Sequence, residues 1–239
     1  MKIVVINGTQ QKGSTYAMKE VFLDVVGRDN SITEFILPAD CPEFCTGCKA
    51  CFYSDISVCP HAKSTVPIWE ALSAADLLVF ASPVYVFHVT AQMKALLDHY
   101  ATKWMAHSPE KQMFSKQAVI ITNSAGAGMR NVIKDISDSL NYWGVARIYS
   151  VKQRLFESRW EHVTDKRKGD ITKQCEKVCH RLKRDGIVRP SLGVKGRFYI
   201  MRIAQNMIHK SQQKKNQPVT RDYIHWQENG WLDGKKPWK

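Results

Sequence analysis

Short apolar runs alternate with segments of helical periodicity along the first 185 or so residues of this chain. Residues 2–7 are rich in Val and Ile and end in Asn7-Gly8, a pattern typical of a buried parallel strand. Residues 14–26 then place apolar side chains at helical spacing. Because strands that alternate with helices pair in parallel through crossovers, the pattern predicts an α/β fold with helices on both sheet faces.

Five such repeats predict a single doubly wound domain with a five-stranded parallel sheet in the flavodoxin-like order 2-1-3-4-5. We expect this domain to span residues 1–186 and to carry a cysteine-containing loop at 41–60. The predicted strands are 2–7, 31–37, 77–81, 118–122 and 145–151, and the predicted helices are 14–26, 66–75, 90–104, 131–143 and 171–184. Ligands of such sheets bind beyond the carboxyl ends of the strands, so the loops there are the candidate site.

The net charge of +13 lies entirely in the last part of the chain. Lys and Arg balance Asp and Glu over residues 1–149, whereas residues 150–239 hold 22 basic against 9 acidic side chains. Residues 187–239 are therefore predicted to form a basic, mostly helical C-terminal extension. Residues 197–208 place a short apolar stripe on one helix face: Ile200, Met201, Ala204, Met207 and Ile208. Packing on the domain or on a second subunit is the favoured interpretation, ahead of a membrane surface, an acidic partner or a nucleic acid.

The chain carries no run of eighteen or more apolar residues, so no transmembrane helix is expected. The apolar run at the N-terminus reaches a polar turn too soon for a secretory signal. We therefore expect a cytoplasmic protein whose seven cysteines stay reduced and do not form a disulfide framework.

Four cysteines lie within fifteen residues, spaced C-x2-C-x2-C-x7-C and followed by Pro60. Four thiolates suit either a [4Fe-4S] cluster or tetrahedral zinc. Structural zinc sites usually use two pairs separated by a long spacer, whereas three cysteines at i, i+3 and i+6 are typical of a ferredoxin-type run. The spacing favours an iron–sulfur cluster, and zinc or an empty thiol loop remain as alternatives. The predicted ligands are Cys45, Cys48, Cys51 and Cys59.

Three polar or flexible loops follow predicted strands one, three and four. Residues 8–15 are small and polar and lead directly into a helix, which suits a phosphate site, although an ordinary turn capped by Ser14 fits equally well. Residues 82–88 contain Pro83 and apolar side chains that could lie against a flat ring. Residues 124–128 are small enough for close backbone approach to a ligand. All three loops on one sheet edge predict a cofactor site more strongly than any one alone.

The order of these parts resembles the flavodoxin-like NADPH-dependent FMN reductase family, and within it most closely the iron–sulfur flavoproteins. The matching segments are G-T-x-x-x-G-S-T at 8–15, C-T-G-C-x-x-C at 45–51, S-P-V-Y at 82–85 and A-Q-M-K-A-L-L-D at 91–98. Gln10 and Gln11 replace the family's Pro and Arg, and Lys12 is expected to supply the charge. The resemblance implies FMN bound by Thr9, Gln11, Lys12, Gly13, Ser14, Thr15, Ser82, Pro83, Val84, Tyr85, Val86, Ser124, Ala125 and Gly126.

The resemblance also implies an NAD(P)H-dependent FMN oxidoreductase that passes electrons to a small-molecule or protein acceptor, through the cluster if one is bound. A flavin carries most of the chemistry itself, and the sequence shows no convincing acid–base pair, so no catalytic side chain is assigned. A homo-oligomer is expected. The alternatives are a non-catalytic electron carrier that serves a protein partner and a zinc-binding interaction module on the same fold.

Overall fold

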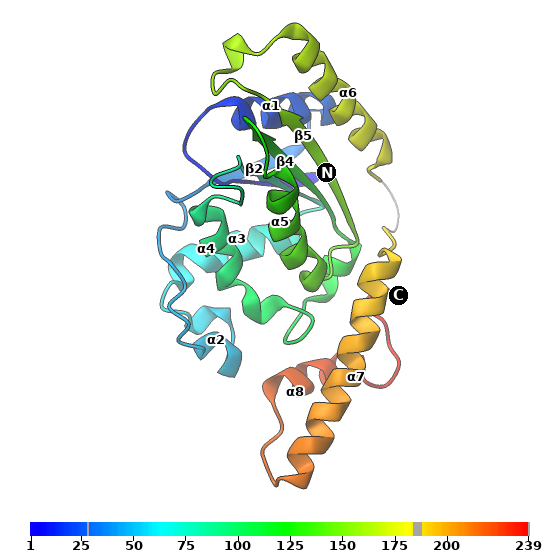
Figure 1. Ribbon diagram of the computed structural model, residues 1–239. Coiled ribbons are helices and arrows are strands. Elements are labelled where there is room, and N and C mark those ends of the chain that lie inside the picture. Colours follow the sequence, from blue (N-terminus) through cyan, green and yellow to red (C-terminus); the bar gives the residue numbers. More distant parts are fainter. Residues whose placement is uncertain (28, 184–187, 239) are drawn as a thin grey trace.

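A computed structural model describes residues 1–27, 29–183 and 188–238 of the chain. All five strands are parallel and lie in the order β2-β1-β3-β4-β5, which confirms the predicted topology (Figure 1). The strands are β1 (Lys2–Asn7), β2 (Ser31–Ile36), β3 (Leu77–Ala81), β4 (Gln117–Ser124) and β5 (Arg147–Arg154).

Helices cover both faces of the sheet (Figure 1). Alternate residues of each central strand point to opposite faces, so Val5 and Val79 belong to one core while Ile6 and Phe80 belong to the other. The first core is closed by α1 (Ser14–Val26) and α6 (Asp165–Arg181), and the second by α3 (Ala62–Ala74), α4 (Ala91–His99) and α5 (Met129–Trp143). A short helix, α2 (Ala50–Tyr53), lies within the cysteine loop.

Several predicted helix ends were wrong. Helix α3 begins four residues earlier than predicted and contains Pro67. Pro67 has no N–H to donate to the Lys63 carbonyl one turn earlier. Both residues are exposed, so water can donate to that carbonyl instead. Helix α4 ends at His99 rather than at 104, and a 3-10 turn (Ala101–Lys103) follows it. Helix α6 begins six residues earlier than predicted and ends at Arg181 rather than at 184. The predicted domain boundary at 186/187 lies outside the described residues.

The C-terminal extension forms α7 (Leu192–Lys214) and α8 (Arg221–Glu228), which extend beyond the sheet (Figure 1). A third apolar core joins the extension to the domain and consists of Met105, Phe114, Val194, Phe198, Trp226 and Trp231. The prediction of a packed extension is confirmed, but the packed face of α7 shares only Met201 with the core contacts expected of the predicted stripe. Ile200, Met207 and Ile208 of the predicted stripe are exposed. Phe198 is buried instead, because the ring of Trp226 stacks on it with centroids 4.9 Å apart.

None of the helices in these described ranges is both long enough and apolar enough to cross a membrane.

Trp226 anchors the extension, since its ring is fully buried and its Nε1 donates to the His107 carbonyl at 3.1 Å. We expect Trp226→Ala to lower the free energy of unfolding by about 3–5 kcal/mol, as for other large-to-small changes at buried aromatic positions. Ile224→Ala on the same helix is the control, because Ile224 is 42% exposed and should change stability much less. Urea unfolding of both variants checks this, and equal losses would contradict the assigned anchor.

Lys116 precedes β4 and is buried, and its Nζ donates to the Ala75 carbonyl at 2.5 Å. Burial lowers the pKa of Lys116 from 10.5 to about 8, although the carboxylates of Asp76 and Glu110 oppose the shift. Between these two pKa values the unfolded chain binds more protons than the folded one. The folded state is therefore stabilised, relative to the unfolded chain, as the pH rises through that window.

We predict that the stability difference between wild type and Lys116→Met changes with pH. Between pH 8 and 10.5 the free energy of unfolding of the wild type should rise relative to that of the variant, by at most about 1.4 kcal/mol per pH unit. Below that window the difference between the two proteins should be constant. Urea unfolding across this range measures it. Lys111→Met at an exposed position is the control, and a pH-independent difference at position 116 would disprove the assigned shift.

Candidate functional site

The loop after β1 is held close to the loop after β3. The hydroxyl of Thr90 donates to the Gly8 carbonyl at 2.6 Å, and both atoms are buried. A Cβ at Gly8 would lie 3.1 Å from Thr90 Oγ1 and 3.2 Å from both Ser82 Cβ and Met93 Cε. These distances are tighter than most side-chain contacts, so a glycine fits the position best.

Thr90 also organises the chain around it. Its Oγ1 accepts from the backbone N–H of Met93 at 3.3 Å and so caps α4, while its own N–H donates to Ser82 Oγ at 3.4 Å. The prediction placed Thr90 inside a helix and not in the site. A Thr directly before a helical run is a recognisable N-cap signal, but the contact with Gly8 joins residues 82 positions apart and has no local signal.

The first turn of α1 is partly occupied by the chain itself. The backbone N–H of Ser14 donates to the Ser158 carbonyl at 3.1 Å, and the Ser14 hydroxyl donates to the Glu157 carbonyl at 2.9 Å. The Thr15 hydroxyl donates to Asn123 Oδ1. The structure gives the N–H groups of Thr15 and Tyr16 no acceptor among the described residues, as is usual for a first helical turn. Those two N–H groups remain available to an anion.

The remaining predicted phosphate residues lie at the surface. Thr9 Oγ1 accepts from the Gln11 N–H at 3.1 Å, which leaves the Thr9 hydroxyl proton free for a ligand. Gln11 and Lys12 are exposed, and Lys12 Nζ lies 5.5 Å from the centre of the Tyr16 ring. Gly13 is the N-cap of α1, and a Cβ there would lie 3.0 Å from the Ser158 carbonyl oxygen. The loop can therefore hold a phosphate while the 157–158 segment closes one side of it.

The loop after β3 forms an apolar, strained turn. Tyr85 and His88 exchange two backbone hydrogen bonds, at 2.9 and 3.0 Å, and Val86 and Phe87 between them have φ of 47° and 68°. A positive φ is unfavourable for a β-branched residue such as Val86 and is often found at functional sites. Val86 is 92% exposed and Phe87 is 60% exposed. The turn therefore offers apolar surface at the carboxyl edge of the sheet.

The loops after β3 and β4 meet at the same edge. The Val84 N–H donates to the Asn123 carbonyl at 3.0 Å, and a Cβ at Gly128 would lie 2.6 Å from a methyl carbon of Val84. Ser124 Oγ is buried and has no hydrogen-bond partner among the described residues. A Cβ at Gly126 would have open space around it. An unsatisfied buried hydroxyl beside an exposed apolar turn suits a flat ring that carries polar edge atoms.

Pro83 and Ala125 complete the predicted set. Ser82 Oγ donates to the Pro83 carbonyl at 3.1 Å, and Ala125 is exposed. The structure thus brings the residues predicted after strands one, three and four to one sheet edge.

The four motif cysteines line one cavity of about 240 Å³: Cys45, Cys48, Cys51 and Cys59. All four are free thiols, of which Cys45 and Cys48 are exposed. A single zinc ion with Zn–S bonds of about 2.3 Å brings its sulfurs within about 3.8 Å of one another. No three of these four sulfurs lie within 4.8 Å of one another in the described chain. The four thiols of the described chain are therefore not gathered closely enough to bind a single all-thiolate zinc ion without movement of the loop.

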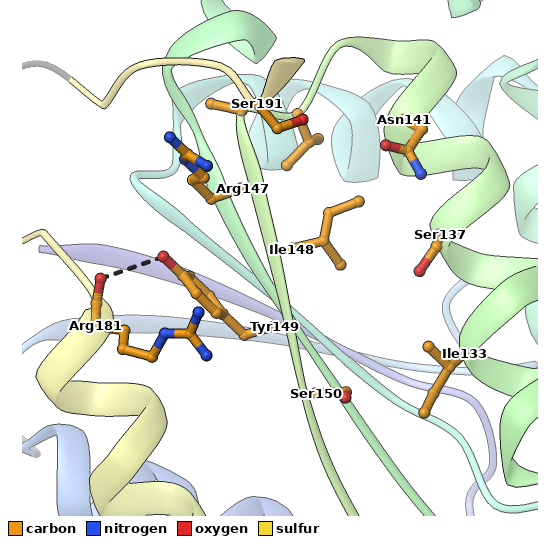
Figure 2. Close-up of a pocket in the computed structure, with 11 residues that line it drawn as sticks. Ile133, Ser137, Asn141, Arg147, Ile148, Tyr149, Ser150, Arg181 and Ser191 are labelled. Atoms are coloured by element: carbon orange, nitrogen blue, oxygen red, sulfur yellow. Dashed lines mark hydrogen bonds between the residues drawn. The ribbon is translucent and has the colours of Figure 1, made fainter. Parts of the chain in front are cut away.

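Two further cavities lie outside the predicted site. One of about 930 Å³ lies between the cysteine loop and the extension. It is lined by Lys49, Phe52 and Tyr53 on one side and by Gln212, residues 217–222 and Ile224 on the other. Another of about 400 Å³ lies beside β5, with Arg147, Tyr149 and Arg181 around it (Figure 2). The β5 residues that line this cavity belong to the first half of the strand. They lie at the end of the strand opposite to the predicted cofactor site.

Comparisons with known proteins agree with this geometry. Residues 1–155 match the family model of NADPH-dependent FMN reductase. An iron-sulfur flavoprotein of Methanocaldococcus jannaschii is 33% identical over 101 residues, which cover 41% of this chain and 51% of that protein. The chain spans about half the length of the first curated relatives it matches.

Two solved structures show the same fold. A structure of an NADH:FMN oxidoreductase in its apo form gives a TM-score of 0.58 at 20% identity and covers 80% of this chain and 95% of its own. A flavone reductase gives a TM-score of 0.60 at 11% identity and covers 99% of this chain and 98% of its own. The second match includes the C-terminal extension.

We predict that Thr90→Val destabilises the protein and that Thr90→Ser, which keeps the hydroxyl, does not. Valine removes the cap of α4, which should lower the free energy of unfolding by about 0.5–2 kcal/mol. It also leaves the Gly8 carbonyl without its donor, which should cost about 1–3 kcal/mol more. Urea unfolding measures the two variants. If serine costs as much as valine, the hydroxyl does not hold the loops together.

Proposed function

Because the chain belongs to the NADPH-dependent FMN reductase family, we propose that it is an FMN-dependent oxidoreductase that takes hydride from NAD(P)H. The observation that carries the proposal is the meeting of three loops at one sheet edge, with the buried and unsatisfied Ser124 hydroxyl among them. Bound FMN would accept two electrons together and release them one at a time.

The phosphate end of FMN would lie on the first turn of α1. The N–H groups of Thr15 and Tyr16, the Thr9 hydroxyl and the Lys12 ammonium are the donors available there. The Ser14 hydroxyl would turn from the Glu157 carbonyl toward the anion. The cation and the helix N-terminus together favour a doubly charged phosphate over a neutral ligand.

The ring of FMN would lie between the 82–86 turn and the 124–126 loop. Tyr85 and Val86 offer apolar surface that excludes water from one side of the ring. The Ser124 hydroxyl and the small loop with Ala125 and Gly126 would approach its polar edge. These residues position the cofactor, and no side chain need transfer a proton.

We propose further that Cys45, Cys48, Cys51 and Cys59 hold a [4Fe-4S] cluster that passes electrons to the acceptor. The position of all four cysteines around one cavity and the similarity of the chain to iron-sulfur flavoproteins support this. The cavity of about 930 Å³ shares Lys49 and Phe52 with the cysteine cavity, so an acceptor bound there would lie next to the cluster.

Two further expectations belong to the proposal. The thiols of the loop need a reducing compartment, so we place the protein in the cytoplasm. The exposed apolar turn at Val86 and Phe87 suits contact with a second copy of the chain, so we expect a homo-oligomer.

The test compares FMN with riboflavin, which has the same ring but no phosphate. Lys12→Ala should weaken FMN binding about tenfold, which corresponds to about 1.4 kcal/mol, and leave riboflavin binding unchanged. Lys2→Ala is the control, because Lys2 is exposed at the opposite end of β1. Fluorescence titration measures both flavins. Equal losses for the two flavins would contradict the phosphate site, and no flavin binding by the wild type would end the proposal.

Anaerobic absorbance with iron and sulfide assays tests the cluster separately, and NAD(P)H oxidation with ferricyanide tests turnover. Iron and sulfide should be present in wild type and lost in Cys45→Ser, because that residue would be a cluster ligand. Negligible turnover in the presence of bound FMN would favour the alternative of an electron carrier that serves a protein partner.

A further inference from the structure

Two histidines lie beside Cys59 in the cysteine cavity. Cys59 Sγ and one ring nitrogen each of His61 and His99 lie within 4.8 Å of one another, and no other set of three Cys, His, Asp or Glu side chains in the described chain does so. We propose that Cys59, His61 and His99 bind a single zinc-type divalent ion. This ligand set shares only Cys59 with the cluster ligands, and the proposal does not depend on FMN.

His99 has the orientation expected of a metal ligand. It is the last residue of α4 and is 4% exposed, and its Nε2 lies 3.1 Å from the Glu43 carbonyl oxygen. Because a carbonyl can only accept, Nε2 carries the proton and Nδ1 keeps its lone pair. Nδ1 is buried and has no hydrogen-bond partner among the described residues. In metal-bound histidines, the ring nitrogen that does not bind the metal usually donates to a carboxylate, a backbone carbonyl or water. His99 Nε2 makes such a bond to a backbone carbonyl.

His61 approaches the same point from α3. It is the N-cap residue of that helix, and its ring lies edge-on to the ring of His99, with centroids 5.2 Å apart and planes at 89°. Its Nδ1 is also buried without a partner in the described chain. The backbone N–H of His61 donates to Cys59 Sγ at 3.4 Å, which helps to hold a thiolate there. Two helices therefore fix the two imidazoles beside the sulfur.

The chemistry of the set selects the ion. One thiolate and two neutral imidazoles suit zinc, which binds sulfur at about 2.3 Å and nitrogen at about 2.0 Å in tetrahedral geometry. Such bonds place ligand atoms about 3.3–3.6 Å apart. The three ligand atoms lie within 4.8 Å of one another, so a contraction of no more than about 1.5 Å would close the site. A solvent molecule can take the fourth position; Cys51 lines the same cavity and can also take it, in which case a second thiol is shared with the cluster set.

The ion and the cluster compete for Cys59. The loop would therefore hold either the cluster or the mononuclear ion, and the ion would fill the loop of iron-free protein. Variants separate the two sites, because Cys45 belongs to the cluster set alone and His99 to the mononuclear set alone.

The experiment titrates iron-free, reduced full-length protein with Co²⁺ and follows the thiolate-to-cobalt charge-transfer band and the visible bands of four-coordinate cobalt. Wild type and Cys45→Ser should bind one equivalent with the same spectrum. His99→Ala and His61→Ala should each lose affinity by about 100-fold or more. His61 is only partly buried, so its variant leaves no large core cavity if His99→Ala folds poorly.

X-ray absorption of the zinc-loaded wild type gives the ligand count directly. We expect two nitrogen scatterers with one or two sulfurs. Four sulfurs, or a cobalt affinity that falls in Cys45→Ser and not in the histidine variants, would overturn the mononuclear site. Loss of iron and sulfide from Cys45→Ser bears on the cluster alone, so failure of one proposal is distinguishable from failure of the other.

Discussion

The hydrogen bond from the Thr90 hydroxyl to the Gly8 carbonyl is the contact on which the candidate cofactor site depends. Parallel strands bring the loops after β1, β3 and β4 to one edge, but topology alone leaves those loops separate. Thr90 joins the loops after β1 and β3 and also caps α4. Asn123, near the end of β4, accepts hydrogen bonds from the Thr15 hydroxyl and the Val84 N–H and so joins the loop after β4 to the other two. Because the two Thr90 bonds are buried, they hold the loop backbones before any ligand is bound, which lowers the ordering cost of binding.

Most of the fold could be predicted because its signals are local. Buried parallel strands such as β1 and β3 are continuous apolar runs, and α1 follows a clear helical period, so their bounds were predicted to the residue. The errors arose where contacts between distant parts of the chain, and not the local sequence, determine which residues are buried. The periodicity of α7 suggested a stripe through Ile200 and Met207, whereas the aromatic contact between Phe198 and Trp226 determines which face is buried.

The site could be predicted only where the motif is contiguous. The cysteine spacing and the small residues at 8–15 identify candidate ligands directly from the sequence. By contrast, the carbonyls of Glu157 and Ser158 reach Ser14 across more than 140 residues, and His99 reaches Cys59 from another helix. A histidine at a helix end is common in any protein. Only its buried, unpartnered Nδ1 distinguishes this one, and that property exists only in three dimensions.

Distance between ligand atoms would separate the two metal chemistries proposed for the cysteine cavity. A single ion needs donor atoms within a few ångströms of one another, and that condition is approached at Cys59 by two imidazoles rather than by the other thiols. A polynuclear cluster supplies its own bridging atoms and so would bind thiols that lie farther apart, and no three of the motif thiols lie within 4.8 Å of one another among the described residues. Because Cys59 belongs to both proposed ligand sets, its thiolate could serve only one at a time. The supply of iron and sulfide would then decide whether this loop transfers electrons or holds a redox-inert ion.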